Sequence, residues 1–200
     1  MEDLDEISFS LGIPVELRET AARLYDIAFG EKLALAIPKN SDRVPLLAKS
    51  LQLEFSLGAF AGPDLVGIAG FSTAAGSLTG GIDYQGLLSE LGWFKGNRAA
   101  LVLSLYERRA RDGELLMDGI VVDPKYRGRG VGSQLFANLM CFARSREYST
   151  IRLDVIDTNP RARKLYERLG FVEEKTERFE FLRGVLGFGS SATMLYKLEG

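Results

Sequence analysis

A glycine- and arginine-rich turn between two apolar segments decides the interpretation of this sequence: residues 123–133 read DPKYRGRGVGS. The apolar run Leu115–Val122 before the turn is typical of a strand buried on both faces, and Asp123-Pro124 ends it. After the turn, apolar residues recur at helical spacing from Val131 to Phe142. The alternate glycines let backbone N–H groups point toward one spot, at which the following helix directs its positive dipole end. The turn is therefore predicted to hold a pyrophosphate.

The charge distribution points to the same ligand class. Residues 108–168 hold 13 Lys and Arg against 8 Asp and Glu, whereas the remainder holds 12 against 19. Within the turn, Arg127 and Arg129 would add charge-assisted hydrogen-bond donors. A net charge of -2 and a pI near 5.4 exclude the strongly basic character typical of nucleic-acid-binding domains. We therefore expect a small anionic ligand and no nucleic acid.

Three other interpretations of the turn compete with a pyrophosphate cradle. A Rossmann dinucleotide site also places a glycine-rich turn before a helix, and Asp154 follows at a suitable distance, but Ser133 stands where that fingerprint has its third glycine. A P-loop is excluded because no Gly-Lys-Ser/Thr follows at the required spacing. A solvated basic turn with a glycine cap is the non-functional alternative.

Length and composition favour one domain over residues 1–200. The chain has 46% hydrophobic and 26% charged residues, which excludes disordered, collagenous and disulfide-stapled classes. The acidic amino terminus lacks a signal-peptide pattern and no apolar run is long enough to cross a membrane, so we expect a cytoplasmic protein without a membrane partner. The single cysteine, Cys141, is predicted to be a small core residue of a helix.

The absence of histidine removes several kinds of chemistry. A Ser-His-Asp triad, a Cys-His pair and an HExxH zinc site are all excluded, and no metal site is expected. Proton transfer must therefore use Asp, Glu, Tyr, Lys, Cys or water.

Hydrophobic periodicity predicts further elements along the chain. Helices are expected from Pro14 to Leu35, from a Ser41-Asp42 cap to Leu51, and from Asn159-Pro160 to Gly170. Strands are expected at 7–11, 55–60, 65–71, 151–156, from 171 and at 193–198, with a hairpin turn at 62–64. Residues 76–112 form a glycine-rich loop and a helical stretch broken near Gly92 and Gly96, which we interpret as an insertion before the central strand.

Two blocks of the sequence carry a family resemblance. Residues 121–132 read VVDPKYRGRGVG and, about thirty residues later, residues 159–171 read NPRARKLYERLGF. In this order, the blocks resemble the GCN5-related N-acetyltransferase (GNAT) superfamily, closely over residues 115–175 and only in pattern before them. The resemblance implies an α/β (α+β) fold with a mixed, largely antiparallel central sheet flanked by helices, and acetyl-coenzyme A as co-substrate.

The resemblance also assigns the cofactor residues. The backbone of Val121 and Val122 would pair with the pantetheine arm like an added strand, and Asn159 would approach the cofactor. The pyrophosphate would be held by the turn, that is by Arg127, Gly128, Arg129, Gly130, Val131 and Gly132.

Acyl transfer to an amine needs a base for the ammonium and an acid for the departing thiolate. Tyr166 matches the family's tyrosine near the sulfur, and its reference pKa of about 10 exceeds the thiol's pKa of about 8.5, so the phenol can donate a proton; packing against the sheet is the alternative. Asp118 matches a common acidic position near the substrate, or else it is a strand-end acid bonded to a loop. Asp154 and Asp157 are weaker candidates for the base.

The expected activity is acetyl transfer from acetyl-coenzyme A to a small-molecule or peptide amine, with a homodimer left open. A non-catalytic acyl-coenzyme A sensor is the alternative from another class. Trp93 and Phe94 in the insertion and Phe181 before the last strand are expected to bind substrate as parts of mobile lids, unless they pack a satellite core. In the segment before the last strand, Glu180 is the nearest acidic residue available to attract an ammonium group.

Overall fold

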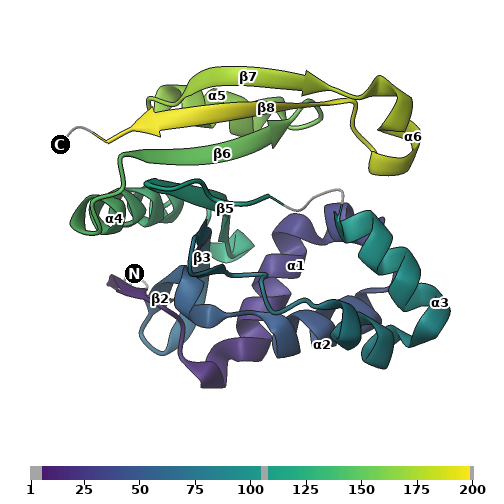
Figure 1. The fold of residues 1–200 in the computed structure, drawn as a ribbon. Coiled ribbons are helices and arrows are strands. Elements are labelled where there is room, and N and C mark those ends of the chain that lie inside the picture. The colour runs from purple at the N-terminus through teal and green to yellow at the C-terminus, as the bar shows by residue number, and fades with distance from the viewer. Residues whose placement is uncertain (1–5, 105–107, 199–200) are drawn as a thin grey trace.

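The computed structural model describes residues 6–104 and 108–198 and shows one mixed sheet flanked by helices (Figure 1). Neighbouring strands are antiparallel except for one parallel pair, β5–β6. The expected fold class is thereby confirmed. Across the sheet the strands are β1 (Ile7–Leu11), β2 (Ser56–Ala61), β3 (Asp64–Thr73), β5 (Glu114–Val122), β6 (Thr150–Ile156), β8 (Ser190–Lys197) and β7 (Val172–Arg178), and the short β4 (Gly76–Ser77) pairs with β3.

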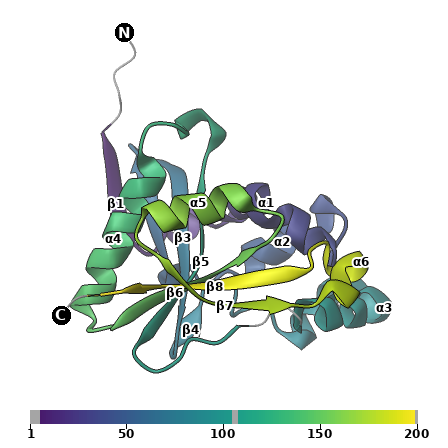
Figure 2. The same cartoon turned by 90° about the horizontal axis from the view of Figure 1, so that it is seen from above.

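Helices connect these strands at the places that the sequence indicates, apart from the short α6, which the sequence analysis does not predict. They are α1 (Arg18–Ala34), α2 (Asn40–Ser50), α3 (Tyr84–Ser104), α4 (Val131–Ser145), α5 (Pro160–Arg168) and the single turn α6 (Arg183–Leu186). Figure 2 shows α4 at the left of the sheet and the helices α1, α2 and α3 at the right. No helix in the described ranges is both long and apolar enough to cross a membrane.

Two local predictions are wrong. Ser41-Asp42 does not cap α2, because the helix begins one residue earlier, at Asn40, whose side-chain amide donates to Asp26. Cys141 is exposed, not buried, since the apolar stripe of α4 that faces the sheet passes through Leu135 and Leu139 instead.

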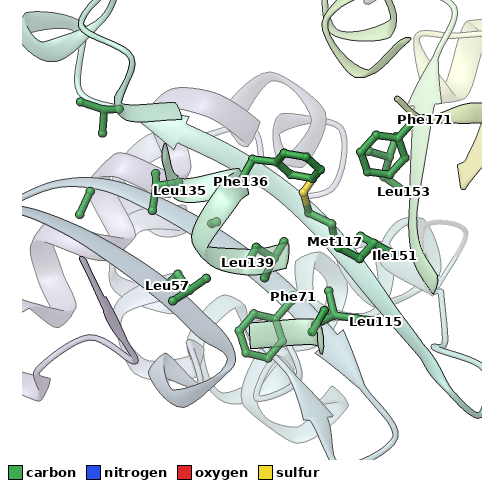
Figure 3. Packing of buried hydrophobic residues seen from close by; sticks show 14 of the residues in the cluster. Leu57, Phe71, Leu115, Met117, Leu135, Phe136, Leu139, Ile151, Leu153 and Phe171 are labelled. Atoms are coloured by element: carbon green, nitrogen blue, oxygen red, sulfur yellow. The ribbon is translucent and has the colours of Figure 1, made fainter. Parts of the chain in front are cut away.

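The main core lies between α4 and one face of the sheet (Figure 3). Leu135, Phe136 and Leu139 of α4 pack against Phe71 of β3 and Leu115 of β5, and all five are nearly inaccessible to solvent. At roughly 25 cal/mol per Å² of buried apolar surface, such side chains each contribute about 1.5–3 kcal/mol to folding. This packing fixes the orientation of α4 relative to β5, and with it the position of the glycine-rich turn that joins them.

The opposite face of the sheet is covered by α1 and α2. Ile68 of β3 packs in a second cluster with Ala21, Leu24 and Leu47 of these helices, whereas its neighbour Ala69 packs in the α4 cluster. Successive side chains of a strand point to opposite faces, so β3 is buried on both sides.

A buried ion pair joins α1 to α2. Arg43 Nε lies 2.6 Å from Asp26 Oδ1, and both side chains are less than 10% exposed. Arg43 also donates to the carbonyl oxygens of Ile37 and Pro38 at 2.9 and 2.8 Å. Because these bonds satisfy the buried charges, they hold α1, which lines the site described below, at a fixed distance from α2.

The predicted break in the third helix is confirmed, with different roles for its two glycines. Gly92 adopts φ +75° inside α3 and forms the kink. Gly96 is helical and lies where a Cβ atom would come within 2.8 Å of the Leu87 carbonyl oxygen, so it permits close contact between the two halves. α3 lies within residues 76–112; that this range is an insertion stays a prediction.

Candidate active site

A cleft opens between β5 and β6 because their pairing stops early. The two strands pair only from Glu114–Leu116 to Thr150–Arg152, although β5 continues to Val122 and β6 to Ile156. Beyond these pairs β5 bonds to β3 and β6 bonds to β8, so the facing edges of β5 and β6 are not paired with each other. The cleft measures about 920 Å³ and is lined by both strands, the glycine-rich turn, α5 and part of α1.

The glycine-rich turn forms one end of this cleft. Gly128 and Gly130 adopt φ +76° and +81°, and a Cβ atom at Gly128 would meet no heavy atom within 4 Å and one at Gly130 only Gln134 Nε2, at 4.0 Å. Gly130 is the residue before α4, whose first backbone N–H groups have no partner within the helix. The turn thus presents amide donors and open space at a helix amino terminus, which suits an anion.

The two arginines of the turn differ in placement. Arg127 lines the cleft, and its Nε donates to the Val122 carbonyl oxygen at 3.1 Å. Arg129 does not line the cleft, and its guanidinium lies 5.2 Å from the centre of the Tyr126 ring. Direct contact with a ligand in the cleft is therefore better supported for Arg127 than for Arg129.

Residues expected from the family resemblance are brought together around the cleft. Val121, Val122, Val131, Gly132, Asn159 and Tyr166 all line it. The Asn159 side chain accepts a hydrogen bond from Ala162 N at 3.1 Å and thereby caps α5. The side-chain oxygen of Asn159 is therefore occupied in capping α5, although the residue lines the cleft.

Tyr166 projects from α5 into the cleft and packs against the core at the same time. Its ring lies edge-on to Phe171, with centroids 5.6 Å apart. Burial raises the pKa of the Tyr166 hydroxyl above its ordinary value, because the charged phenolate would lose solvation. The side chain is thus held rigidly and stays protonated at neutral pH.

Asp118 occupies a bulge in the central strand. The register with β3 pairs Gly70 with Gly119 and Phe71 with Met117, so Asp118 is the extra residue. Its Oδ1 accepts a hydrogen bond from Ser72 Oγ at 3.0 Å. Burial, together with the charge of Asp118, raises the pKa of the Tyr25 hydroxyl, and both residues line the second cavity described next.

A second cavity, of about 810 Å³, meets the cleft at this point. Of the residues that the structure describes, the two cavities share Phe29, Asp118 and Asp154. Asp154 is oriented by Thr193, which donates to Oδ1 at 2.7 Å, and by Arg108, whose Nε lies 3.6 Å from Oδ2. A molecule in each cavity would therefore meet the other beside two carboxylates.

The three aromatic residues expected to bind substrate lie elsewhere. Trp93, Phe94 and Phe181 are 67%, 82% and 84% exposed, and neither cavity is lined by them. From the same segments, Tyr84 and Leu87 line the second cavity and Gly187 and Phe188 line the cleft. Glu180 is paired with Arg183 at 2.7 Å. The lid roles stay a prediction that the two cavities do not support.

Sequence reasoning missed several residues around the junction. Phe29 of α1 lines both cavities, Ser72 of β3 lines the second cavity and bonds to Asp118, and Thr193 of β8 bonds to Asp154 without lining either cavity. None of them carries a local sequence signal, since each is one of several similar residues on an apolar or alternating segment. Among the described residues, no cluster of three or more His, Cys, Asp or Glu side chains is arranged to bind a metal ion.

Comparisons with known proteins agree with this geometry. A segment of 56 residues is 39% identical to a thialysine N-epsilon-acetyltransferase of Bos taurus, covering 28% of this chain and 33% of that protein. A segment of 83 residues is 34% identical to N-alpha-acetyltransferase 30 of Xenopus laevis, covering 42% and 30%. These alignments span about a third of the relatives' length.

The fold also matches that of solved acetyltransferases. A Bacillus subtilis acetyltransferase in complex with CoA superposes with a TM-score of 0.57 over 97% of this chain and 100% of that one, at 17% identity. The model of the acetyltransferase (GNAT) family matches residues 21–171, which include the glycine-rich turn, the cavity junction and most of the residues that line the cleft. With three quarters of its length matching the family model, this chain belongs to the GNAT acetyltransferase family.

Proposed function

We propose that this protein transfers an acetyl group from acetyl-coenzyme A to the amino group of an acceptor. The observation that carries the proposal is the junction of two cavities at Asp118 and Asp154. One cavity has an anion-binding turn at its end, and the other opens toward different elements. Such an arrangement holds two reactants in contact, which replaces a bimolecular encounter by a reaction within one complex.

Two features of the cleft support acetyl-coenzyme A as the co-substrate. The amides at the start of α4, with Arg127 beside them, would hold its pyrophosphate. The unpaired edge of β5 at Val121 and Val122 would bond its amide-containing arm as an added strand. The thioester would then lie toward the cavity junction, beyond the arm.

Tyr166 would act as the general acid of the reaction. The acceptor's neutral nitrogen forms a bond to the acetyl carbon, the carbon–sulfur bond breaks, and Tyr166 gives its proton to the departing sulfur. The nitrogen, which is positively charged after the attack, releases one proton to solvent as the amide forms. Its raised pKa keeps that proton in place until negative charge develops on sulfur. The phenolate regains a proton from solvent after the products leave.

Asp118 would act as the general base, through water, and Asp154 lies close enough to the junction to share this work. An alkylamine with a pKa of about 10.4 is mostly charged at pH 7, so generating its neutral form requires about 4–5 kcal/mol. The Asp118 carboxylate, held by Ser72 in a partly buried position, would take this proton through water and pass it on to solvent. The backbone N–H of Val121 or a neighbour would stabilise the charge on the acetyl oxygen.

Coenzyme A release with a panel of amines, measured beside calorimetric binding of acetyl-coenzyme A, tests this proposal. We expect turnover in the parent protein and a loss of kcat of about 10²–10⁴-fold in Tyr166→Phe, with acetyl-coenzyme A affinity unchanged. Binding without turnover of any amine would identify a sensor instead. Turnover by Tyr166→Phe within threefold of the parent would leave Tyr166 as a packing residue.

A further inference from the structure

The second cavity carries a balanced set of charges, of which the proposed reaction uses only the acidic half. Its charged lining residues are two acidic and two basic, within the described part of the chain. Asp118 and Asp154, the aspartate pair, lie at the junction with the cleft. Arg108 and Arg109, the arginine pair, belong to the segment that leads into β5. The remaining lining is neutral and includes several hydroxyl groups.

A buried ion pair between β5 and β6 holds the segment that carries the arginine pair. Arg152 of β6 lies 3.1 Å from Glu114 of β5, and both side chains are less than 10% exposed. Arg152 also donates to the carbonyl oxygen of Arg109 at 2.8 Å, and Glu114 accepts from the backbone N–H of Arg111 at 3.2 Å. These two hydrogen bonds tie the buried pair to the backbone of the segment that carries the arginine pair.

The opposite charges in the cavity lie close to each other. Arg108 Nε is 3.6 Å from Asp154 Oδ2, at the junction itself. An acceptor that brought only a positive charge to this junction would be attracted by the aspartate pair and repelled by the arginine pair. An acceptor with both charges would present its positive end to the aspartate pair and its negative end to the arginine pair, and guanidinium groups are well suited to bind a carboxylate through two parallel hydrogen bonds.

We propose that the acceptor is a zwitterion, an amine with a carboxylate one or two carbons away, whose ammonium faces the aspartate pair and whose carboxylate binds the arginine pair. This inference rests on the proposed function and names its substrate class. Free amino acids have this chemistry, whereas polyamines and peptide amino termini lack a carboxylate beside the amine. The short separation follows from the 3.6 Å between Arg108 and Asp154.

The test compares acceptors that differ only in the carboxylate. Each amino acid of a panel is assayed beside its α-carboxamide and its decarboxylated amine, and kcat/KM is corrected to the concentration of neutral amine. We expect the carboxylate form of at least one amino acid to be preferred at least tenfold over both partners. A panel in which carboxamides, simple amines or peptides are used as well as every amino acid would overturn the inference while leaving acetyl transfer established. Turnover of no amine at all would instead contradict the proposed function.

Substitutions then ask whether the arginine pair carries the preference. In Arg109→Gln, and more strongly in the double variant Arg108→Gln/Arg109→Gln, we expect the preference to fall below threefold through a higher KM for the amino acid. Arg111→Gln is the matched control, because Arg111 belongs to the same segment but pairs with Glu174 and does not line the cavity. Affinity for acetyl-coenzyme A and the melting temperature are measured for each variant. A double variant that folds, binds acetyl-coenzyme A and keeps the tenfold preference would overturn the assignment.

Discussion

Replacing Gly130 by alanine separates the role of the glycine-rich turn in binding from its role in folding. Gly130 adopts φ +81°, a conformation that costs an L-residue about 1–2 kcal/mol. A Cβ atom there would meet only Gln134 Nε2, at 4.0 Å, so the backbone strain is the whole expected effect on stability. For a domain of this size each kcal/mol lowers the melting temperature by about 2–4 °C, which predicts a decrease of about 2–8 °C.

Gly130→Ala is also expected to weaken ligand binding, by a mechanism separate from the backbone strain. The added methyl group would project into the open cradle in front of the first amides of α4, where the pyrophosphate has to approach the backbone. Losing one charge-assisted hydrogen bond costs about 1.5–3 kcal/mol. Calorimetry should therefore show acetyl-coenzyme A binding weakened at least tenfold, which corresponds to about 1.4 kcal/mol or more.

Gly62→Ala provides the matched control. Gly62 lies in the turn between β2 and β3 at φ +55°, a Cβ atom there would meet nothing within 4 Å, and the residue does not line the cleft. It should lower the melting temperature to a similar extent and leave acetyl-coenzyme A affinity as in the parent. If Gly130→Ala bound acetyl-coenzyme A as tightly as Gly62→Ala does, the turn would not be the pyrophosphate site.

Two further predictions concern stability. Tyr25 has its pKa raised by burial and by the charge of Asp118, so above pH 10 the unfolded chain releases a proton that the folded chain keeps, and the unfolding free energy should fall by about 1.36 kcal/mol per pH unit. Urea unfolding between pH 9.5 and 11 should show a smaller decline of the unfolding free energy in Tyr25→Phe than in the parent protein. An equal decline in both proteins would mean that Tyr25 ionises as easily in the folded chain as in the unfolded chain. Arg43→Leu leaves Asp26 as a buried charge without its partner and should lower the unfolding free energy by about 3–5 kcal/mol, measured by urea unfolding at pH 7. A loss below 1 kcal/mol would show that the pair contributes little to holding α1 on α2.

Features that depend on neighbouring residues could be predicted well from the sequence. The end of the central strand at Asp123-Pro124, a glycine-dependent turn at 128–130 and the start of α4 at Val131 all follow from local rules. Steric limits on φ and ψ, the missing N–H of proline and the hydrogen bonds of the first helical turn act within a few residues. The same locality explains why Gly92 could be identified as a break in α3.

The exposure of Cys141 and the placement of Trp93, Phe94 and Phe181 depended on three-dimensional packing. An apolar or aromatic residue on a helix can face a core, a cavity or solvent, and its type alone does not decide among them. In this protein the sheet-facing stripe of α4 passes through other residues, so Cys141 is left outside.

By itself, the sequence determined the glycine-rich turn, the elements on either side of it and the expectation of an anionic ligand. Only the tertiary structure decided that β5 and β6 separate after a few parallel pairs and that Asp118 and Asp154 line the same junction. The physical reason is the range of the interactions. Turns and helix ends are set by bonds between near neighbours, whereas strand register and the meeting of distant side chains are set by the packing of α1 and α4 on opposite faces of one sheet.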